Sequence, residues 1–364
     1  MRIAIDATPF VEGTGGISRY TAELAGALAK EFPDDEYWLV SDQDWTGGPE
    51  ETPNLRRGRR PQNWLARRWW LAGLPWELTR LGAAIFHGTD FAVPYVPVMP
   101  SVMMFHDTSP WQEGERRLDA AERVRRRTPW LVRLATMIVT PSEAVRREVI
   151  ERFAVSPSRA VAVPLAASDV FRPAAEAGVA EVRARLGITG PYILFVGTAE
   201  RRKNLGRLVA AWREARLAHP GLGLVVVGRR GPDSQVLNFQ NQPGLIATGP
   251  LTDREVAALL AGAVAFVYPS LYEGFGLPVL EAMQTGTPAV ISRDRALQEV
   301  AGGAAVTVDA LSIRALAESL VELTRDSHWR LELRERGFRR AAQFSWRHTA
   351  KKTREVYVEA VRRF

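Results

Sequence analysis

Two carboxylates eight residues apart, Glu273 and Glu281, enclose the stretch of this sequence with the clearest chemistry. The stretch follows a short apolar run, and Pro278 is typical of the first turn of a helix. Gly274 and Gly276 leave backbone N–H groups open to an anion. The two carboxylates could accept hydrogen bonds from both ends of a polyhydroxylated ligand while those N–H groups hold a phosphate. The alternative, a helix with an acidic first turn and no ligand, explains neither the glycines nor Glu273.

A second motif places three consecutive cations, Arg201 to Lys203, between a buried strand and a helix, in the segment Val196–Asn204. Cations are unfavourable at a helix N-terminus, where the helix dipole favours anions. A solvated basic turn would tolerate this at small cost. A bound diphosphate would turn the cost into a gain, because Arg and Lys donors and helix N–H groups would converge on one anion. We favour a diphosphate site that also includes Thr198.

The first half of the chain has two histidines next to predicted strands. His106 and Asp107 follow the apolar run Val102–Phe105, and His87 follows Ala83–Phe86. The carboxyl ends of strands in an open α/β sheet face the ligand crevice, so we expect both imidazoles to point there. A lone histidine is more often structural than functional, but its position after a strand favours His106. Asp107 could bind a hydroxyl group or orient the site.

A glycine-rich loop, Gly13 to Ile17, separates the first strand from the first helix. Its glycines, including Gly15 and Gly16, would let the backbone approach a ligand at the helix N-terminus. A plain flexible connection is an equally good interpretation of the loop taken alone, and the spacing is not that of a dinucleotide site. A D-x-D string at Asp42–Asp44 is interpreted as a solvated turn, so we predict no metal site.

These motifs need a scaffold of alternating strands and helices. Apolar runs rich in β-branched residues, as in parallel strands covered on both faces, alternate with amphipathic segments such as Ser18–Lys30, Leu205–Ala218 and Ile313–Thr324. This pattern predicts an α/β protein with two doubly wound parallel sheets. The predicted strands are Arg2–Asp6, Tyr37–Val40, Ala83–Phe86, Val102–Phe105, Met137–Thr140, Val161–Val163, Tyr192–Val196, Leu224–Val227, Ala265–Tyr268, Ala289–Ile291 and Ala305–Val308.

The length of 364 residues suits two domains. A segment rich in Pro and Gly divides the chain, which gives a first domain over residues 1–168, a linker over 169–189 and a second domain over 190–345. Residues 346–364 form a last amphipathic helix.

The composition excludes several classes of protein. Cysteine is absent, which rules out disulfides, thiolate metal sites and a cysteine nucleophile. No apolar run approaches the ~20 residues of a membrane span, and the N-terminus has no secretory signal, so we expect a cytoplasmic protein. The 48 Lys and Arg against 41 Asp and Glu give a formal charge of +7, which favours an anionic partner. No zinc-finger, helix-turn-helix or RRM motif points to nucleic acid.

The motifs together resemble the retaining glycosyltransferases of family 4, whose GT-B fold has two Rossmann-like domains facing across a cleft and a last helix that returns to the N-terminal domain. The resemblance runs over nearly the whole chain. It is carried, in order, by Gly15-Gly16-Ile17, His106-Asp107, Arg202-Lys203-Asn204, the Glu273–Glu281 pair and Phe344-Ser345-Trp346. The chain departs from the pattern at Arg201, where proline is frequent, and in the linker before Asp169, where many relatives have glycine.

The resemblance implies a nucleotide-sugar donor in the second domain and an acceptor in the first. Glu281 would bind the ribose hydroxyls and Glu273 the donor sugar, while Arg202 and Lys203 would hold the diphosphate. His106 would contact the sugar near the reacting centre, and Gly16 would approach from the opposite domain. The expected catalytic residues are thus His106, Glu273, Lys203 and Arg202. The other expected substrate contacts are Gly15, His87, Asp107, Thr198, Leu251 beside the base, and the backbone of Gly274, Phe275, Gly276 and Leu277.

The implied reaction is transfer with retention of the anomeric configuration, without a metal ion or other cofactor. Cations and N–H groups would stabilise the leaving diphosphate, whose oxygen takes the proton of the attacking hydroxyl. The His-Asp and Arg-Lys-Asn motifs are most similar to the mannosyltransferase subgroup, so the preferred donor is GDP-mannose. UDP-glucose, UDP-GlcNAc and dTDP-rhamnose remain alternatives, as do a GT-A enzyme and a non-catalytic nucleotide-sugar binding protein.

An Arg-rich and Trp-rich stretch, Arg56–Trp76, lies in the half that binds acceptors in the family. Cations attract anionic lipid headgroups and Trp prefers the membrane interface. We therefore expect a saccharide or lipid-linked saccharide acceptor and association with the inner face of the membrane. A basic surface over core tryptophans is a nearly equal alternative.

Overall fold

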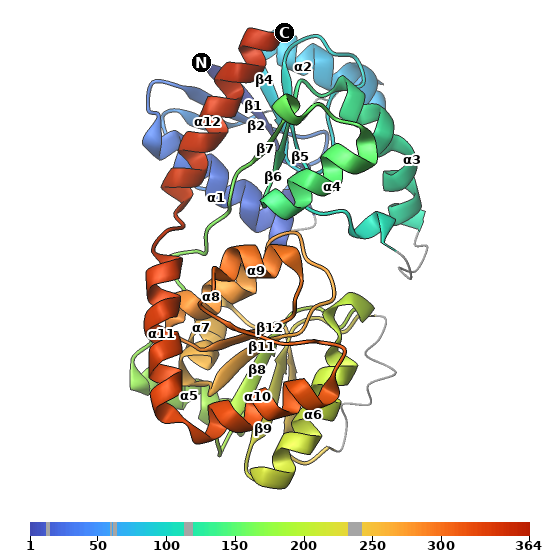
Figure 1. Ribbon diagram of the computed structural model, residues 1–364. Helices are drawn as coiled ribbons and strands as arrows, with labels where there is room; N and C mark the ends of the chain where they lie inside the picture. Colours follow the sequence, from blue (N-terminus) through green and yellow to red (C-terminus); the bar gives the residue numbers. More distant parts are fainter. Residues whose placement is uncertain (12–14, 59, 61–63, 113–118, 232–241) are drawn as a thin grey trace. The chain divides into compact units, whose positions relative to one another are not determined.

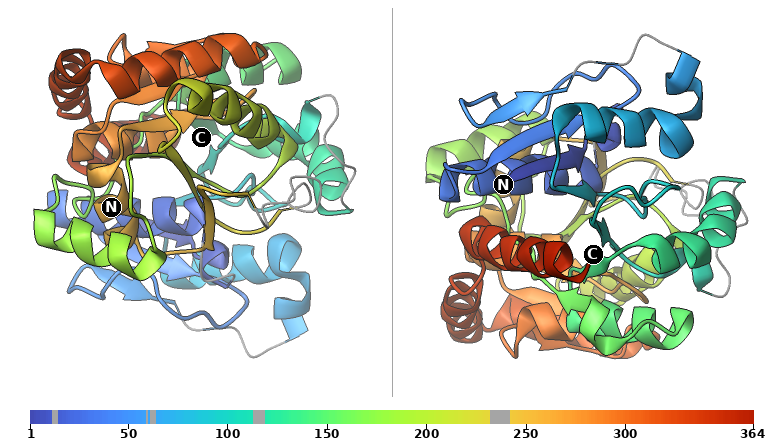
Figure 2. Two further views of the ribbon diagram at one scale, coloured as in Figure 1. Left: turned by 90° about the horizontal axis from the view of Figure 1, so that it is seen from below. Right: turned by 90° about the horizontal axis from the view of Figure 1, so that it is seen from above.

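A computed structural model describes residues 1–11, 15–58, 60, 64–112, 119–231 and 242–364. The chain divides into two compact units, the first made of Met1–Leu165 with Ser345–Phe364 and the second of Ala166–Phe344. Each unit contains one sheet in which all strands run parallel, with helices on both faces (Figures 1 and 2). The prediction of two Rossmann-like α/β domains is confirmed.

The first sheet has the strand order β3-β2-β1-β4-β5-β6-β7. Its strands are β1 (Arg2–Asp6), β2 (Glu36–Val40), β3 (Leu55–Arg57), β4 (Ile85–Gly88), β5 (Ser101–Met104), β6 (Met137–Thr140) and β7 (Ala160–Ala162). Its helices are α1 (Gly16–Glu31), α2 (Leu74–Leu81), α3 (Asp119–Leu134), α4 (Glu143–Phe153) and the C-terminal α12 (Trp346–Arg363).

The second sheet has the order β10-β9-β8-β11-β12-β13. Its strands are β8 (Tyr192–Val196), β9 (Gly223–Val227), β10 (Leu245–Gly249), β11 (Ala265–Tyr268), β12 (Ala289–Ile291) and β13 (Val306–Thr307). The helices are α5 (Glu176–Leu186), α6 (Leu205–Ala218), α7 (Asp253–Gly262), α8 (Leu277–Thr285), α9 (Arg295–Ala301), α10 (Ile313–Arg325) and α11 (Ser327–Ala341).

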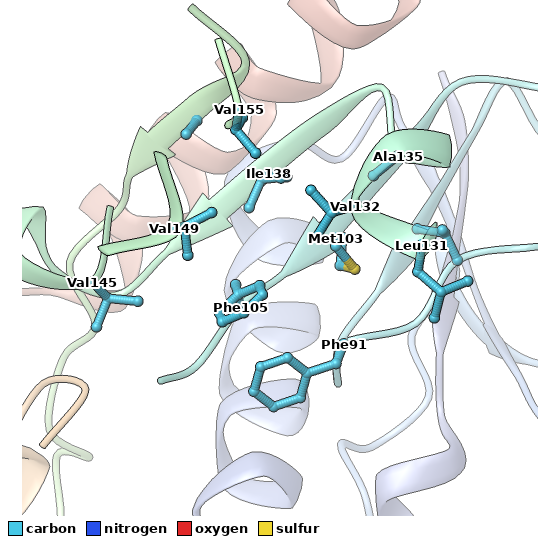
Figure 3. Packing of buried hydrophobic residues seen from close by; sticks show 12 residues of the cluster. Phe91, Met103, Phe105, Leu131, Val132, Ala135, Ile138, Val145, Val149 and Val155 are labelled. Atoms are coloured by element: carbon cyan, nitrogen blue, oxygen red, sulfur yellow. The ribbon is translucent and has the colours of Figure 1, made fainter. Parts of the chain in front are cut away.

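Two hydrophobic clusters fill the first unit on the face covered by α2, α3 and α4. One, shown in Figure 3, packs Phe91 and Phe105 against Leu131 of α3 and Val145 of α4. The other lies beneath α2 and includes Phe86 of β4. Side chains alternate between the faces of a strand, so the residue after Phe86 points to the opposite face, where α1 and α12 lie.

The last helix belongs to the first unit, as predicted. α12 packs beside α1 (Figure 1) and contacts β4, β5 and β6. Arg354 of α12 reaches back to Asp35, with its Nε 2.7 Å from the carboxylate, and the hydroxyl of Thr349 donates to the carbonyl of Pro164 at 2.7 Å. These contacts fix the end of the chain on the first sheet.

The segment predicted as a linker, 169–189, lies within the second unit. It contains α5, which packs against α7. Val182 and Ile188 are buried, and the guanidinium of Arg183 donates to the carbonyl of Gly190 at 3.0 Å. The structure thus places the boundary between the units at Leu165–Ala166 because α5 contributes to the second unit's core.

Candidate active site

A cluster of charged side chains forms in the second unit where β8 and β11 end side by side. These two strands pair in parallel, so the turn after β8 and the loop after β11 meet at one edge of the sheet. The turn, Arg201–Lys203, is a short 3-10 helix that precedes α6, rather than the N-terminus of α6 itself. The backbone N–H of Leu271 donates to the carbonyl of Arg202 at 2.7 Å and ties the two segments together.

Glu273 is held by two cations of this turn. Lys203 Nζ lies 2.5 Å from Glu273 Oε1, and Arg202 Nη1 lies 3.3 Å from Oε2. Lys203 and Glu273 are only 7% and 8% exposed. Burial alone would raise the pKa of Glu273, but the charges of Lys203 and Arg202 hold it below its usual value. The carboxylate is therefore ionised at neutral pH and paired.

Lys203 is positioned by an aromatic neighbour that the sequence did not single out. The Tyr268 hydroxyl accepts a hydrogen bond from Lys203 Nζ at 2.5 Å, and the ammonium lies 4.7 Å from the centroid of the ring. Burial lowers the pKa of Lys203, although Glu273 opposes that shift. Tyr268 ends the predicted strand β11, and its position beside the loop predicted to bind an anion is the signal that could have identified it.

Asn204 fixes the backbone behind the cations. It adopts the left-handed conformation (φ 57°) between the 3-10 turn and α6, and its Nδ2 donates to the carbonyls of Pro269 and Ala310 at 3.2 and 2.8 Å. Asn is among the few non-glycine residues that tolerate this conformation. The Arg-Lys-Asn motif thus combines two cations with a residue that sets their backbone.

Helix α8 begins at the same edge of the sheet, and its first turn has no acidic residue. Its N-cap is Gly276 in a left-handed conformation (φ 106°), and a Cβ there would lie 2.6 Å from Leu297 Cδ2. Gly276, Gly274, Phe275 and Leu277 therefore occupy the loop and helix start where the sequence predicted anion-binding N–H groups. No acidic side chain in the first turn of α8 compensates the positive end of the helix dipole. This position therefore favours an anionic ligand.

Glu281 is buried on the second turn of α8 and is 4% exposed. Asp294, which sequence reasoning missed, accepts hydrogen bonds from the backbone N–H groups of Leu297 at 3.0 Å and Glu273 at 3.4 Å. Burial raises the pKa of Asp294 to about 6, and the charge of Glu273 adds to that rise. Asp294 thereby links the N-terminus of α9 to the loop of the predicted donor site.

Thr198 and Leu251 follow strands β8 and β10, which lie on either side of β9 in the sheet. Between them, after β9, lies a loop with Arg229 and Arg230 exposed. A Cβ on Gly228 would lie 2.1 Å from the carbonyl oxygen of Gly197, so only glycine permits this packing. Sequence reasoning overlooked this loop, although glycine followed by two arginines after an apolar run could have signalled it.

In the first unit, His106 and Asp107 follow β5 as predicted. His106 Nε2 lies 2.7 Å from the carbonyl oxygen of Thr89. The carboxylate of Asp107 accepts a hydrogen bond from the backbone N–H of Ser109 at 2.8 Å, which stabilises the turn after it. Asp107 is thus engaged with its own loop, and both roles predicted for it stay predictions.

The prediction that His87 points to the ligand crevice is wrong. β4 extends to Gly88, so His87 lies inside the strand, and its side chain is 0% exposed. Its ring lies between two tyrosines, with Nδ1 2.6 Å from the Tyr357 hydroxyl and Nε2 3.4 Å from that of Tyr20. Burial lowers the pKa of His87 to about 3, so the ring is neutral and belongs to the core.

The glycine-rich loop is described only from Gly15 onward, and Gly13 and Thr14 lie outside the described residues. Gly15 precedes α1 with φ 135°, a conformation that favours glycine, and Gly16 is the first residue of the helix. A Cβ on either would meet nothing within 4 Å. Backbone conformation therefore requires glycine at position 15, whereas the described residues leave open space around position 16.

Two further properties concern metal ions and membranes. Within the described ranges, no three histidine or acidic side chains gather so that they could hold a metal ion. Asp44 of the D-x-D string pairs instead with Arg60 at 2.6 Å. Among the helices that the structure describes, none has the length and apolar character to cross a bilayer.

Comparison with protein families gives two matches in chain order. Residues 14–167 match the family described as Glycosyltransferase Family 4, and residues 180–342 match Glycosyl transferases group 1. The O-antigen chain mannosyltransferase B of Escherichia coli is 33% identical over 295 residues, which cover 78% of this chain and 76% of that protein. The MMP alpha-(1->4)-mannosyltransferase of Mycolicibacterium hassiacum is 33% identical over 235 residues, covering 62% and 54%.

Solved structures with the same fold cover almost the entire chain. Sucrose-phosphate synthase from Thermosynechococcus elongatus superposes with a TM-score of 0.76 at 20% identity, over 99% of this chain and 98% of that one. WaaG, a glycosyltransferase involved in lipopolysaccharide biosynthesis, gives 0.69 at 16% identity, over 98% and 99%. At these identities the likeness concerns the fold.

Proposed function

Because this chain belongs to glycosyltransferase family 4, we propose that it transfers mannose from GDP-mannose to a saccharide acceptor with retention of the anomeric configuration. Two of its relatives at 33% identity are mannosyltransferases by name, and one of them acts on the O-antigen chain. That similarity supports mannose as the sugar and polysaccharide or glycolipid biosynthesis as the setting.

The observation that carries the proposal is the cluster of Arg202, Lys203 and Glu273 beside the N-terminus of α8. Two cations and the first turn of a helix can together hold a diphosphate and stabilise its charge as it leaves. In this proposal Glu281 binds the ribose hydroxyls and Glu273 the sugar. Positive side chains at the diphosphate also support transfer without a metal ion.

Our proposal of retention depends on whether a carboxylate of the protein or an oxygen of the diphosphate assists the attack. A retaining glycosidase uses a free carboxylate as nucleophile about 5 Å from its acid. Glu273, by contrast, is paired with two cations, which lowers its nucleophilicity. We therefore assign the acceptor's proton to an oxygen of the departing diphosphate, so that the hydroxyl attacks on the face that the diphosphate leaves.

A thermal-shift screen of GDP-, UDP- and dTDP-sugars tests the donor, because a ligand that binds the native state raises the melting temperature. The expected result is the largest rise with GDP-mannose. Mannose transfer to an oligosaccharide, with the product's anomer assigned by NMR and EDTA present, then tests retention and metal independence. A UDP- or dTDP-sugar with the larger shift would replace the donor. A donor that binds but is never transferred would point to a non-catalytic binding protein.

The acceptor is proposed to be lipid-linked, reached from an anionic membrane surface. Trp64 and Trp76 are 74% and 59% exposed, and Arg67 and Arg68 are exposed with them. Arg56 and Arg57 are also exposed, but they belong to the edge strand β3, where their guanidinium carbons lie 5.7 and 5.9 Å from the ring centroids of Trp38 and Trp45. We therefore centre the surface on residues 64–76.

This exposed surface continues into two other segments. The backbone N–H of Tyr95 donates to the carbonyl of Trp70 at 2.7 Å, and the Tyr95 ring lies edge-on to Trp130 of α3 with centroids 5.0 Å apart. Trp130 is itself exposed. Aromatic side chains with cations beside them suit the interface of a bilayer with anionic headgroups.

Flotation with liposomes containing anionic lipid tests this surface. Changing both Arg67 and Arg68 to Gln should reduce binding, since each basic residue near an anionic surface contributes about 1 kcal/mol. The same change at Arg213 and Arg339, which are exposed in the second unit, is the control and should leave binding unchanged. Absence of wild-type binding, or equal losses in the two double variants, would contradict membrane association through this surface.

A further inference from the structure

His106 has one ring nitrogen whose hydrogen is fixed by its partner. Nε2 lies 2.7 Å from the carbonyl oxygen of Thr89, which can only accept a hydrogen bond. Nε2 must therefore carry a hydrogen in the neutral ring as well as the charged one. Among the described residues, Nδ1 of His106 makes no hydrogen bond. In the neutral ring Nδ1 is therefore an acceptor, available to a hydroxyl group.

Two aromatic rings set the plane of His106. The Tyr20 ring of α1 lies edge-on to the imidazole, with centroids 5.1 Å apart and an interplanar angle of 87°. Phe91, from the loop between β4 and β5, lies 6.2 Å away at 71°. Phe91 has φ 49°, a conformation rarely adopted by bulky residues, while its ring packs against Phe105 with centroids 4.8 Å apart. The loop thus accepts backbone strain at the residue beside His106.

The Tyr20 side chain is itself positioned by buried neighbours. It is 2% exposed, and its hydroxyl lies 3.4 Å from His87 Nε2. The other nitrogen of His87 lies 2.6 Å from the hydroxyl of Tyr357 on α12. Because the His87 ring is neutral, one of its nitrogens donates a hydrogen bond and the other accepts one. Each nitrogen faces one tyrosine hydroxyl. A continuous series of contacts therefore runs from α12 through β4 and α1 to His106.

We propose that Tyr20 is a positioning residue: together with the Thr89 carbonyl it fixes the plane and the tautomer of His106, so that Nδ1 accepts a hydrogen bond from a sugar hydroxyl. The proposal rests on the proposed glycosyl transfer. It gives the buried Tyr20–His87–Tyr357 group a function beyond packing. It also explains why a histidine with one hydrogen-bond partner among the residues that the structure describes is nevertheless held in one orientation.

Ring ¹⁵N NMR of histidine-labelled protein tests the tautomer without any substrate. The wild type should show His106, assigned from its loss in His106→Asn, as the Nε2–H form. Tyr20→Leu removes the ring that packs on His106 and should shift the resonances toward a mixture of tautomers. Tyr20→Phe keeps the edge-on ring and should retain the wild-type tautomer.

Kinetics give the second measurement. A displaced group near the reacting centre costs up to about 100-fold, so Tyr20→Leu should lower kcat/KM about 10- to 100-fold. Tyr20→Phe, which loses only a long hydrogen bond, should stay within about fivefold of the wild type. Tyr192→Phe is the matched control: that buried tyrosine of the second unit also loses one hydrogen bond, 2.7 Å to the carbonyl of Leu259, and kcat/KM should be unchanged.

The outcomes separate this proposal from the proposed function. A folded Tyr20→Leu variant with the wild-type tautomer and kcat/KM within about fivefold would overturn the positioning role. If Tyr20→Leu does not fold, Phe91→Leu removes the other flanking ring and replaces it in both measurements. If the wild type transfers no sugar at all, the proposed function fails, whereas the NMR comparison still decides whether Tyr20 controls the His106 ring.

Discussion

Replacement of Lys203 by methionine should destabilise the second unit before any ligand is considered. Lys203 is 7% exposed, and its ammonium lies 2.5 Å from both Glu273 and the hydroxyl of Tyr268. Methionine keeps most of the side-chain volume but leaves a buried carboxylate with less compensation. Removing one member of a buried ion pair costs about 3–5 kcal/mol. Arg202 still contacts Glu273 at 3.3 Å, so we expect the lower end, about 3 kcal/mol.

The loss of stability in Lys203→Met should be greater at neutral than at acidic pH. In the wild type, burial opposes ionisation of Glu273, but Lys203 and Arg202 hold its pKa below the usual value. Its contribution to stability is therefore present above the unfolded-state pKa and is lost as the pH falls through the lowered value. In Lys203→Met the ammonium no longer offsets the effect of burial, so the pKa of Glu273 rises. Protonation of Glu273 then removes the unfavourable buried charge. The difference between the two proteins should be largest near pH 7 and smaller near pH 4.5.

Urea denaturation and thermal melts, both followed by circular dichroism at the two pH values, measure this difference. At about 2–4 °C per kcal/mol for a unit of this size, the melting temperature should fall by about 6–12 °C at pH 7. Adding Glu273→Gln to Lys203→Met should recover part of the loss, because the carboxylate that lost its ammonium partner is then replaced by a neutral amide. Lys30→Met, at an exposed position in the last turn of α1, is the control. Equal stability at pH 7, or a difference that grows on acidification, would refute the argument.

Two other predictions concern helix α8. Gly276→Ala should lower stability by about 1–3 kcal/mol and reduce the donor-induced thermal shift, because φ is 106° and a Cβ would lie 2.6 Å from Leu297 Cδ2. Gly178→Ala within α5, where φ is ordinary and the space is open, should be neutral or slightly stabilising in the same melts. Glu281→Gln should raise the Kd for the nucleotide sugar about 10-fold or more while the protein still folds, because hydrogen bonds to a charged group are worth about 1.5–3 kcal/mol; calorimetric titration would show an unchanged Kd if Glu281 does not contact the donor.

The central strands could be predicted from sequence because their physics is local. β1, β6, β8, β11 and β12 have the predicted bounds, since buried parallel strands are continuous apolar runs. The edge strands β3 and β10 were missed. Leu55 is buried in β3, but Arg56 and Arg57 are exposed, so the segment has no apolar run for the pattern to detect. An edge strand is defined by its neighbour in the sheet, and a single sequence does not contain that information.

His87 shows why a shift of two residues can reverse a functional prediction. The apolar run suggested that the strand ends at Phe86, but β4 runs from Ile85 to Gly88. His87 therefore alternates with Phe86 and faces α1 and α12. Its partner Tyr357 lies 270 residues further along the chain, so no local pattern could reveal the contact. Of the candidate residues, His106 and Glu273 follow their strands as predicted, because both strands end where their apolar runs do, to within a residue.

The net charge of the chain supports a donor site less strongly than the geometry of the turn Arg201–Lys203 does. The formal charge of +7 suggested an anionic ligand. At the predicted diphosphate site, however, Arg202 and Lys203 already pair with the carboxylates of Glu200 and Glu273, so that these four residues with Arg201 have a net formal charge of only +1. Arg202 contacts both carboxylates, at 2.9 and 3.3 Å. Long-range attraction at this site is therefore small, and affinity for a diphosphate must come from donors already oriented in a dry environment. It follows that a substitution that keeps the charge but alters the donor geometry, such as Lys203→Arg, should weaken donor binding more than removal of the exposed charge of Arg201.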